Sequence, residues 1–195
     1  MKLYVGTEST WSLRALICLA ISQIDAQVQC FTLRSEEGKR ALQAVSPTRL
    51  VPLLDDEGTT IHDSLAITEY LNEVAPGRLY PTERAQRAVC RSLCAEMHSG
   101  FLAIRQSMPF TTEIVTRDIQ PSDAALREIE RLTAIFAAAQ GRFLFGDAPT
   151  AADAFYAVMA YRLNCYHVVL EGRAGEYQQN AINWDVLQHA LESLR

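Results

Sequence analysis

The sequence predicts a mixed α/β domain followed by an all-helical domain. In the first eighty residues, short segments with the alternating apolar pattern of strands are interspersed with segments whose apolar residues recur at helical spacing. After the breaks at Pro76-Gly77 and Tyr80-Pro81, only the helical spacing remains. A chain of 195 residues, 49% of them hydrophobic and 21% charged, is long enough for two such domains with a shared core. We therefore expect one domain at residues 1–80 and the other at residues 81–195.

The first domain is predicted to follow the order βαβαββα, a compact mixed sheet with helices on both of its faces. Pro47 ends the second helix, and Ser64 caps the third. An acidic turn joins the last two strands as a hairpin. The strands are expected at 3–5, 28–33, 51–54 and 60–62, and the helices at 12–22, 36–45 and 64–74.

The second domain is predicted to contain only helices. Thr150 and Asp153 stand three residues apart just before the most apolar of them, a spacing that lets side chain and backbone donors satisfy each other. We interpret this pair as a capping box with a structural role, at the start of a buried central helix. The helices are expected at 82–106, 123–140, 150–170 and 184–194.

Composition and charge exclude several classes of function. A net charge of −5 without any block of Lys or Arg argues against nucleic acid as a partner. The longest apolar stretches are shorter than the ~20 residues that span a bilayer, and the first residues lack the apolar core of a signal peptide. Five cysteines without a CxxC pair are typical of reduced thiols, so a cytoplasmic protein is expected. The histidines show no metal-ligand spacing, and no metal is expected.

Four segments carry a resemblance to a known family. They are Glu8–Arg14, the pair formed by 50–53 and 62–67, 95–109, and 146–153. In this order they resemble the cytosolic glutathione transferases, in particular bacterial serine-type members near the zeta class. The resemblance covers essentially the whole chain. It implies a thioredoxin-like first domain, glutathione as co-substrate and a homodimer.

The resemblance implies a site for the glutathione backbone. Pro52 would follow a cis peptide bond, which turns the polar backbone groups of Val51 toward the cysteinyl part of the tripeptide. Ser64 would meet the γ-glutamyl carboxylate at a helix N-terminus, beside Asp63, which replaces the family's commoner Glu. Lys39 would reach the glycyl carboxylate. The structural alternatives are a simple helix cap at Ser64 and a solvated surface charge at Lys39.

The segment between the first strand and the first helix supplies the candidate for catalysis. By resemblance, Ser9 is the residue whose hydroxyl donates to the glutathione sulfur, with Thr10 and Ser12 as alternatives. Trp11 stands where zeta enzymes carry a cysteine. The structural alternative is that these hydroxyls only compete to cap the helix.

The segment at 95–109 is expected to face the active-site turn. Spacings of three and four place residues on one helix face, and the resemblance makes that face part of the pocket for the electrophile. A stripe of Met and aromatic residues fits a hydrophobic core equally well. His98 is expected to be packed or hydrogen-bonded between the domains. The candidate pocket residues are Trp11, Met97, Phe101, Arg105 and Met108.

Three functions follow from this interpretation. The first is a glutathione transferase in which Ser9 stabilises the thiolate that attacks a small electrophile, with isomerisation of a dicarboxylic diketone or peroxidase activity as variants. The second is a non-catalytic binding protein that keeps the fold. The third, a thiol–disulfide oxidoreductase, needs a cysteine at the start of the first helix, where this chain has Ser9, Thr10 and Ser12.

Overall fold

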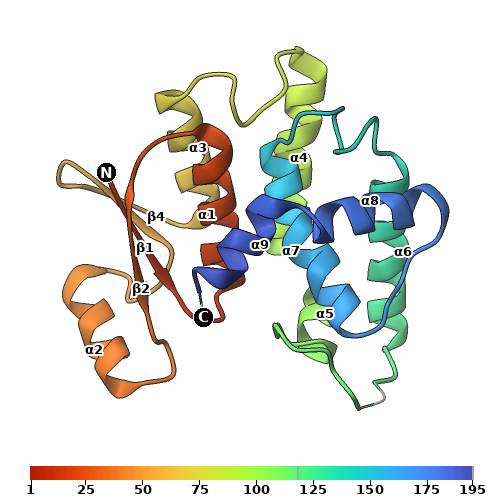
Figure 1. Ribbon diagram of the computed structural model, residues 1–195, viewed down its shortest axis with the longest axis horizontal. Helices are drawn as coiled ribbons and strands as arrows, with labels where there is room; N and C mark the ends of the chain where they lie inside the picture. Colours follow the sequence, from red (N-terminus) through yellow and green to blue (C-terminus); the bar gives the residue numbers. More distant parts are fainter. Residues whose placement is uncertain (118, 195) are drawn as a thin grey trace.

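The computed structural model describes residues 1–117 and 119–194. Its first part is a four-stranded sheet with three helices, in the predicted order βαβαββα, and its second part is helical (Figure 1). The fold class predicted from the sequence is confirmed. The predicted boundary at residue 80 falls between the two parts and stays a prediction. The elements of the first part are β1 (Lys2–Gly6), α1 (Thr10–Ser22), β2 (Gln27–Phe31), α2 (Glu36–Val45), β3 (Leu53–Asp56), β4 (Thr59–His62) and α3 (Ser64–Val74).

The sheet has the strand order β2-β1-β3-β4. β1 runs parallel to β2 and antiparallel to β3, and β4 returns antiparallel to β3. The alternation along β1 decides which helix covers which face, because successive side chains point to opposite faces. Leu3 and Val5 join the core with α1 and α3, whereas Tyr4 packs with Leu42 of α2. Figure 1 shows the sheet between α2 on one side and α1 with α3 on the other.

The helical part differs from the prediction in three respects. Its elements are α4 (Arg84–Ser99), α5 (Leu102–Ser107), α6 (Asp123–Ala137), α7 (Ala151–Cys165), α8 (Gly172–Ile182) and α9 (Asp185–Glu192). The single helix predicted at 82–106 is wrong, because the chain breaks at Gly100 and Phe101. Phe101 has a φ of 58°, and a side chain at Gly100 would lie 2.7 Å from the Glu96 carbonyl oxygen. The helix predicted at 150–170 ends at Cys165, and α8 was not predicted.

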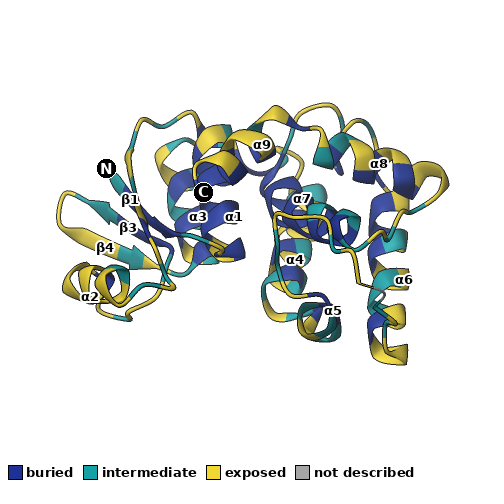
Figure 2. Cartoon of the chain, turned by 60° about the horizontal axis from the view of Figure 1, so that its bottom comes forward, coloured by how far each residue is buried: buried dark blue, intermediate teal, exposed yellow. Residues whose placement is uncertain are grey.

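The central helix α7 is buried along nearly its whole length (Figure 2). The predicted capping box at its start is confirmed. One Asp153 carboxylate oxygen accepts the N–H and hydroxyl of Thr150, both at 2.8 Å. The other accepts the Leu144 N–H at 2.9 Å and the Tyr177 hydroxyl at 3.0 Å. Within the described residues, no helix combines the length and apolar character needed to cross a membrane.

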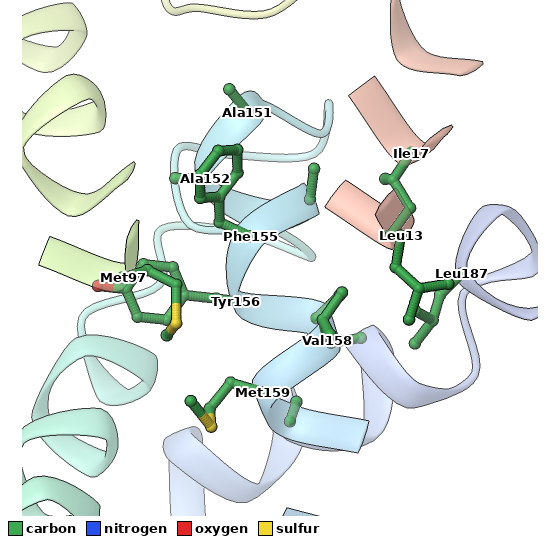
Figure 3. Close-up of a cluster of buried hydrophobic side chains, with 14 of the residues drawn as sticks. Leu13, Ile17, Met97, Ala151, Ala152, Phe155, Tyr156, Val158, Met159 and Leu187 are labelled. Atoms are coloured by element: carbon green, nitrogen blue, oxygen red, sulfur yellow. The ribbon is translucent and has the colours of Figure 1, made fainter. Parts of the chain in front are cut away.

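The two parts of the chain share one hydrophobic core. Leu13 and Ile17 of α1 face Val158 of α7 and Leu187 of α9, as Figure 3 shows. This packing fixes the N-terminal turn of α1 against the helical domain. Side chains from both domains therefore meet at that turn.

Candidate functional site

Three loops meet at one end of the sheet. They follow β1, precede β3 and follow β4. Leu53 of β3 pairs with Tyr4 on one side and with His62 on the other. Extending both antiparallel registers by two residues brings Val51 level with Gly6 and with Ser64. The predicted glutathione-binding segments thus lie at one edge, beside the start of α1.

The Val51–Pro52 peptide bond is cis, as predicted. Neither the N–H nor the C=O of Val51 has a hydrogen-bond partner in the part of the chain that the structure describes. Strands that end with unpaired backbone groups can take up an extended peptide as an additional strand. Val51 is therefore available for such a contact.

Asp63 and Ser64 form the start of α3. Asp63 has a φ of 77° and a ψ of 131°, and one of its carboxylate oxygens accepts the Leu65 N–H at 2.7 Å. The other carboxylate oxygen lies 3.1 Å from Nε2 of His98, which belongs to α4. The Ser64 hydroxyl is fully buried and has no partner among the described residues. His98 thus bridges the two domains, as expected, and the binding role of Ser64 stays a prediction.

The structure separates the three candidate hydroxyls at the start of α1. Ser9 is the N-cap, and its Oγ accepts the Ser12 N–H at 3.1 Å, which leaves its own proton free to donate. The Ser12 hydroxyl is fully buried and accepts the Gly6 N–H at 3.1 Å, so it faces the sheet. Thr10 is buried in the first turn. Ser9 is the candidate whose placement suits a donor at the helix N-terminus, and its catalytic role stays a prediction.

Arginines from both domains gather beside Trp11. The guanidinium carbons of Arg14 on α1 and Arg105 on α5 lie 5.4 and 5.1 Å from the centre of the Trp11 ring. Arg162 on α7 lies 5.8 Å from the ring centre of Phe110. We call Arg14, Arg105 and Arg162 the arginine cluster. Its members come from three helices that the sequence separates widely.

Among the described residues, no acidic side chain forms an ion pair with Arg14 or Arg162, whereas buried cations are usually paired. Arg14 and Arg162 are 1% and 4% exposed, and Nε and Nη1 of each have no hydrogen-bond partner among the described residues. Burial, followed by repulsion from the other two arginines, lowers the pKa of Arg14 to about 9. Burial and repulsion from Arg105 lower the pKa of Arg162 to about 10. Burial also lowers the pKa of Arg105, against a weaker attraction by Glu128. Such a cluster attracts an anion.

A cavity of about 450 Å³ borders Phe110, the aromatic ring beside Arg162. It lies between the loop after β1, the loop after β2, the segment between α5 and α6, and the C-terminal end of the chain. Its walls include Glu8, which adjoins Ser9, and Phe110, which adjoins Arg162. The volume falls in the range of small-molecule sites.

The predicted pocket residues divide into two groups. Trp11 is 37% exposed, and Arg105 is partly exposed beside it. Met97, Phe101 and Met108 are buried in the hydrophobic core, where Met97 faces Tyr156 (Figure 3). This arrangement gives those three a packing role and does not support their predicted contact with an electrophile.

Lys39 lies exposed on α2, where its Nζ pairs with Glu36 at 2.8 Å. Its predicted contact with the glycyl carboxylate would compete with that ion pair.

The cysteines lie away from the start of α1. Cys18, Cys90, Cys94 and Cys165 are buried, and burial raises the pKa of the Cys18 thiol to about 12. Cys30 is exposed on β2. No cluster of three metal-binding side chains occurs among the residues that the structure describes.

Arg14 and Arg162 were not among the predicted site residues. A signal for both was present, since each is a charged residue inside an otherwise apolar helix. An arginine in such a position needs a buried partner or a ligand.

A sheet domain with a cis proline before its third strand, joined to an all-helical domain, defines the two-domain architecture of glutathione transferases. Comparison with known proteins agrees. Family models match residues 8–74, as glutathione S-transferase N-terminal domain, and residues 113–191, as glutathione S-transferase C-terminal domain. The chain belongs to the glutathione S-transferase family.

Its relatives include isomerases. A maleylacetoacetate isomerase of Rattus norvegicus is 30% identical over 157 residues, which cover 77% of this chain and 72% of the relative. A maleylpyruvate isomerase of Ralstonia is 29% identical and covers 80% of this chain and 78% of the relative. A Burkholderia glutathione transferase homologue with bound glutathione superposes with a TM-score of 0.74 at 26% identity, over 100% of this chain and 97% of the other.

Proposed function

We propose that this protein is a glutathione-dependent isomerase or transferase whose electrophile carries negative charge. The arginine cluster is the observation that carries the proposal. Burial of unpaired guanidinium groups is unfavourable, and a carboxylate bound between them would supply both opposite charge and hydrogen-bond acceptors.

Glutathione is proposed to lie along the edge where the three loops meet. Val51 would pair with its cysteinyl backbone, and Asp63 and Ser64 would hold the γ-glutamyl end. Lys39 is assigned to the glycyl carboxylate, if it leaves Glu36. In support, the polar groups of Val51 and the Ser64 hydroxyl have no partner within the described residues. Two similar solved structures contain bound glutathione, which supports glutathione as the ligand.

The thiol of glutathione would then lie at the N-terminus of α1. The Ser9 hydroxyl would donate to the sulfur while its oxygen still accepts the Ser12 N–H. Lowering a thiol pKa from about 8.5 to about 6.5 takes roughly 2.7 kcal/mol. One hydrogen bond to a charged group supplies about 1.5–3 kcal/mol, and a helix N-terminus adds about 0.3–1 kcal/mol. A hydroxyl is therefore sufficient.

For isomerisation, the electrophile would be a conjugated diketo acid with a cis double bond, the class that the names of the relatives indicate. The thiolate sulfur bonds to one alkene carbon, and the displaced electron pair moves onto the conjugated carbonyl oxygen as an enolate. The former double bond rotates. The enolate then re-forms the double bond and expels the thiolate, so glutathione is regenerated. The arginine cluster would hold the carboxylates through these steps.

Assembly as a cytoplasmic homodimer is also proposed. Val74 on α3 and Val89 on α4 are 48% and 52% exposed, which supports an apolar contact surface on these two helices. Light scattering after size-exclusion chromatography would reveal a dimer or contradict this part of the proposal.

The proposed activity is tested with two electrophiles, a cis-unsaturated diketo diacid and the neutral chlorodinitrobenzene. Arg162→Met should raise KM for the diacid by about tenfold or more and change turnover of the neutral substrate by less than about twofold. Arg142→Met, at an exposed position, is the matched control. Glutathione binding without turnover of any electrophile would instead favour the non-catalytic protein.

A further inference from the structure

We propose that His98 is a positioning residue of the glutathione site, which holds the Asp63 carboxylate toward the γ-glutamyl ammonium group from the opposite domain. This inference rests on the proposed binding of glutathione. It assigns to the helical domain a part in recognising glutathione itself.

Both oxygens of the Asp63 carboxylate are held, and from different domains. One accepts the Leu65 N–H at 2.7 Å, within α3, and the other lies 3.1 Å from Nε2 of His98 on α4. An ionised carboxylate only accepts hydrogen bonds, so Nε2 can donate to it in the tautomer that places the ring proton there. Each carboxylate oxygen has a second lone pair, and the Asp63 side chain is 41% exposed. A further donor can therefore still reach it.

The backbone conformation of Asp63 is unusual, so the orientation of its carboxylate depends on the contacts that the side chain makes. Its φ of 77° with ψ of 131° lies in a sparsely populated region for a residue with a Cβ. Such conformations persist where surrounding contacts hold them, and they gather at ligand sites. His98 is the contact that comes from outside the loop and α3.

The neighbouring Ser64 indicates which end of glutathione would bind to Asp63 and Ser64. Its hydroxyl is fully buried without a partner in the described part of the chain, at the positive end of the α3 dipole. A carboxylate acceptor thus adjoins a hydroxyl donor at a helix N-terminus. This combination matches the α-amino acid end of a γ-glutamyl group, with its ammonium on Asp63 and its carboxylate at Ser64.

The His98 ring makes no other polar contact with the residues that the structure describes. Its Nδ1 is buried without a partner in the described residues, so Asp63 is the polar contact of the ring. Two other charged side chains of α4 are engaged elsewhere, Arg91 with Glu69 and Glu96 with Arg131. A residue needed only for packing between domains would serve better without an unpaired ring nitrogen.

The test is calorimetric titration of glutathione into the full chain and its variants. His98→Phe keeps the ring volume and removes the donor, and it should weaken glutathione binding by about five- to twentyfold. His98→Gln, which restores an N–H donor, should stay within about threefold of the parent. In an Asp63→Asn background, His98→Phe should add less than about twofold.

A glutathione analogue in which hydrogen replaces the γ-glutamyl ammonium group separates recognition from packing. His98→Phe and the parent should bind this analogue within about twofold of each other. Equal weakening of glutathione and of the analogue would overturn the proposal, as would an unchanged affinity for glutathione in His98→Phe. If His98→Phe does not fold, His98→Asn replaces it in both titrations. A parent that does not bind glutathione would refute the proposed function, an outcome distinct from either of these.

Discussion

Ser9→Ala separates the structural and catalytic tasks of one hydroxyl. As the N-cap of α1, Ser9 accepts the Ser12 N–H at 3.1 Å, and loss of such a cap destabilises a protein by about 1 kcal/mol. The proposed hydrogen bond from Ser9 to the thiolate is worth about 1.5–3 kcal/mol. Its loss should raise the pKa of bound glutathione by about 1–2 units, toward the free thiol value near 8.5.

The assay is the pH dependence of kcat/KM, together with thiolate absorbance of the glutathione complex. Near neutral pH, kcat/KM should fall about ten- to hundredfold in Ser9→Ala, while glutathione affinity changes much less. Ser122→Ala is the matched control, because Ser122 caps α6 by accepting the Ala125 N–H at 3.2 Å. It should lose the same stability without any shift of the pH profile.

The result that refutes the reasoning is a Ser9→Ala profile that overlays the parent's. If Thr10→Ala then shifts the profile, the thiolate partner is Thr10. A Ser9→Cys variant gives an independent check, since its sulfur would lie beside the glutathione thiol and should form a mixed disulfide under oxidising conditions.

Three further predictions concern binding and stability. Ser64→Ala should weaken glutathione binding by about 1–3 kcal/mol, and an unchanged Kd in calorimetry would contradict its role. Arg14→Met should stabilise the ligand-free protein at pH 7 by about 1–4 kcal/mol in urea unfolding. Lowering the pKa of Arg14 from 12.5 to about 9 corresponds to a cost of about 5 kcal/mol for the buried charge. The loss of the contacts of Arg14 with Trp11 and Phe155 reduces the gain from removing that charge. The unfolded chain keeps this proton to higher pH than the folded protein, so the advantage of the variant should shrink as pH rises above about 9. Asp153→Asn should lower the free energy of unfolding by about 2–5 kcal/mol in the same measurement, because its amide NH₂ group would face the donors of Leu144, Thr150 and Tyr177. A decrease of less than about 1 kcal/mol would contradict this.

Local signals explain which elements could be predicted. The helices at 36–45 and 64–74 match the structure at both ends, because polar residues cap them and polar or proline-rich segments follow. The prediction that Ser64 caps α3 is wrong, because Asp63 is the cap and Ser64 is the first residue of the helix. The break between α4 and α5 has one such signal, Gly100, which the helical spacing on both sides of it outweighed in the prediction. At the break, Arg105 donates to the carbonyl oxygens of Met97 and Gly100, at 2.7 and 3.0 Å, so a side chain from across the break satisfies carbonyl groups at the end of α4.

The placement of the predicted glutathione-binding residues could be derived from the sequence, whereas their contact with glutathione stays a prediction. Val51, Pro52 and Ser64 stand in a pattern that is short and local, and the structure brings them to one edge. Arg14 and Arg162 were missed because the spacing of apolar residues predicts a helix whether or not a charged residue interrupts its apolar face, and it gives no role to that residue. Only the packing of α1 against α7 shows that both guanidinium groups point into the same buried region.

The arginine cluster links the stability of the fold to its ligand. Replacement of buried charges by apolar residues often stabilises a protein, so a cluster of unpaired cations is unfavourable for folding alone. An anion that binds the folded chain and not the unfolded one offsets this cost, by about 2.7 kcal/mol at a concentration a hundred times its Kd. Arg14 comes from the sheet domain, and Arg105 and Arg162 come from the helical domain. The proposed anion site, like the contact between His98 and Asp63, therefore lies where the two domains meet.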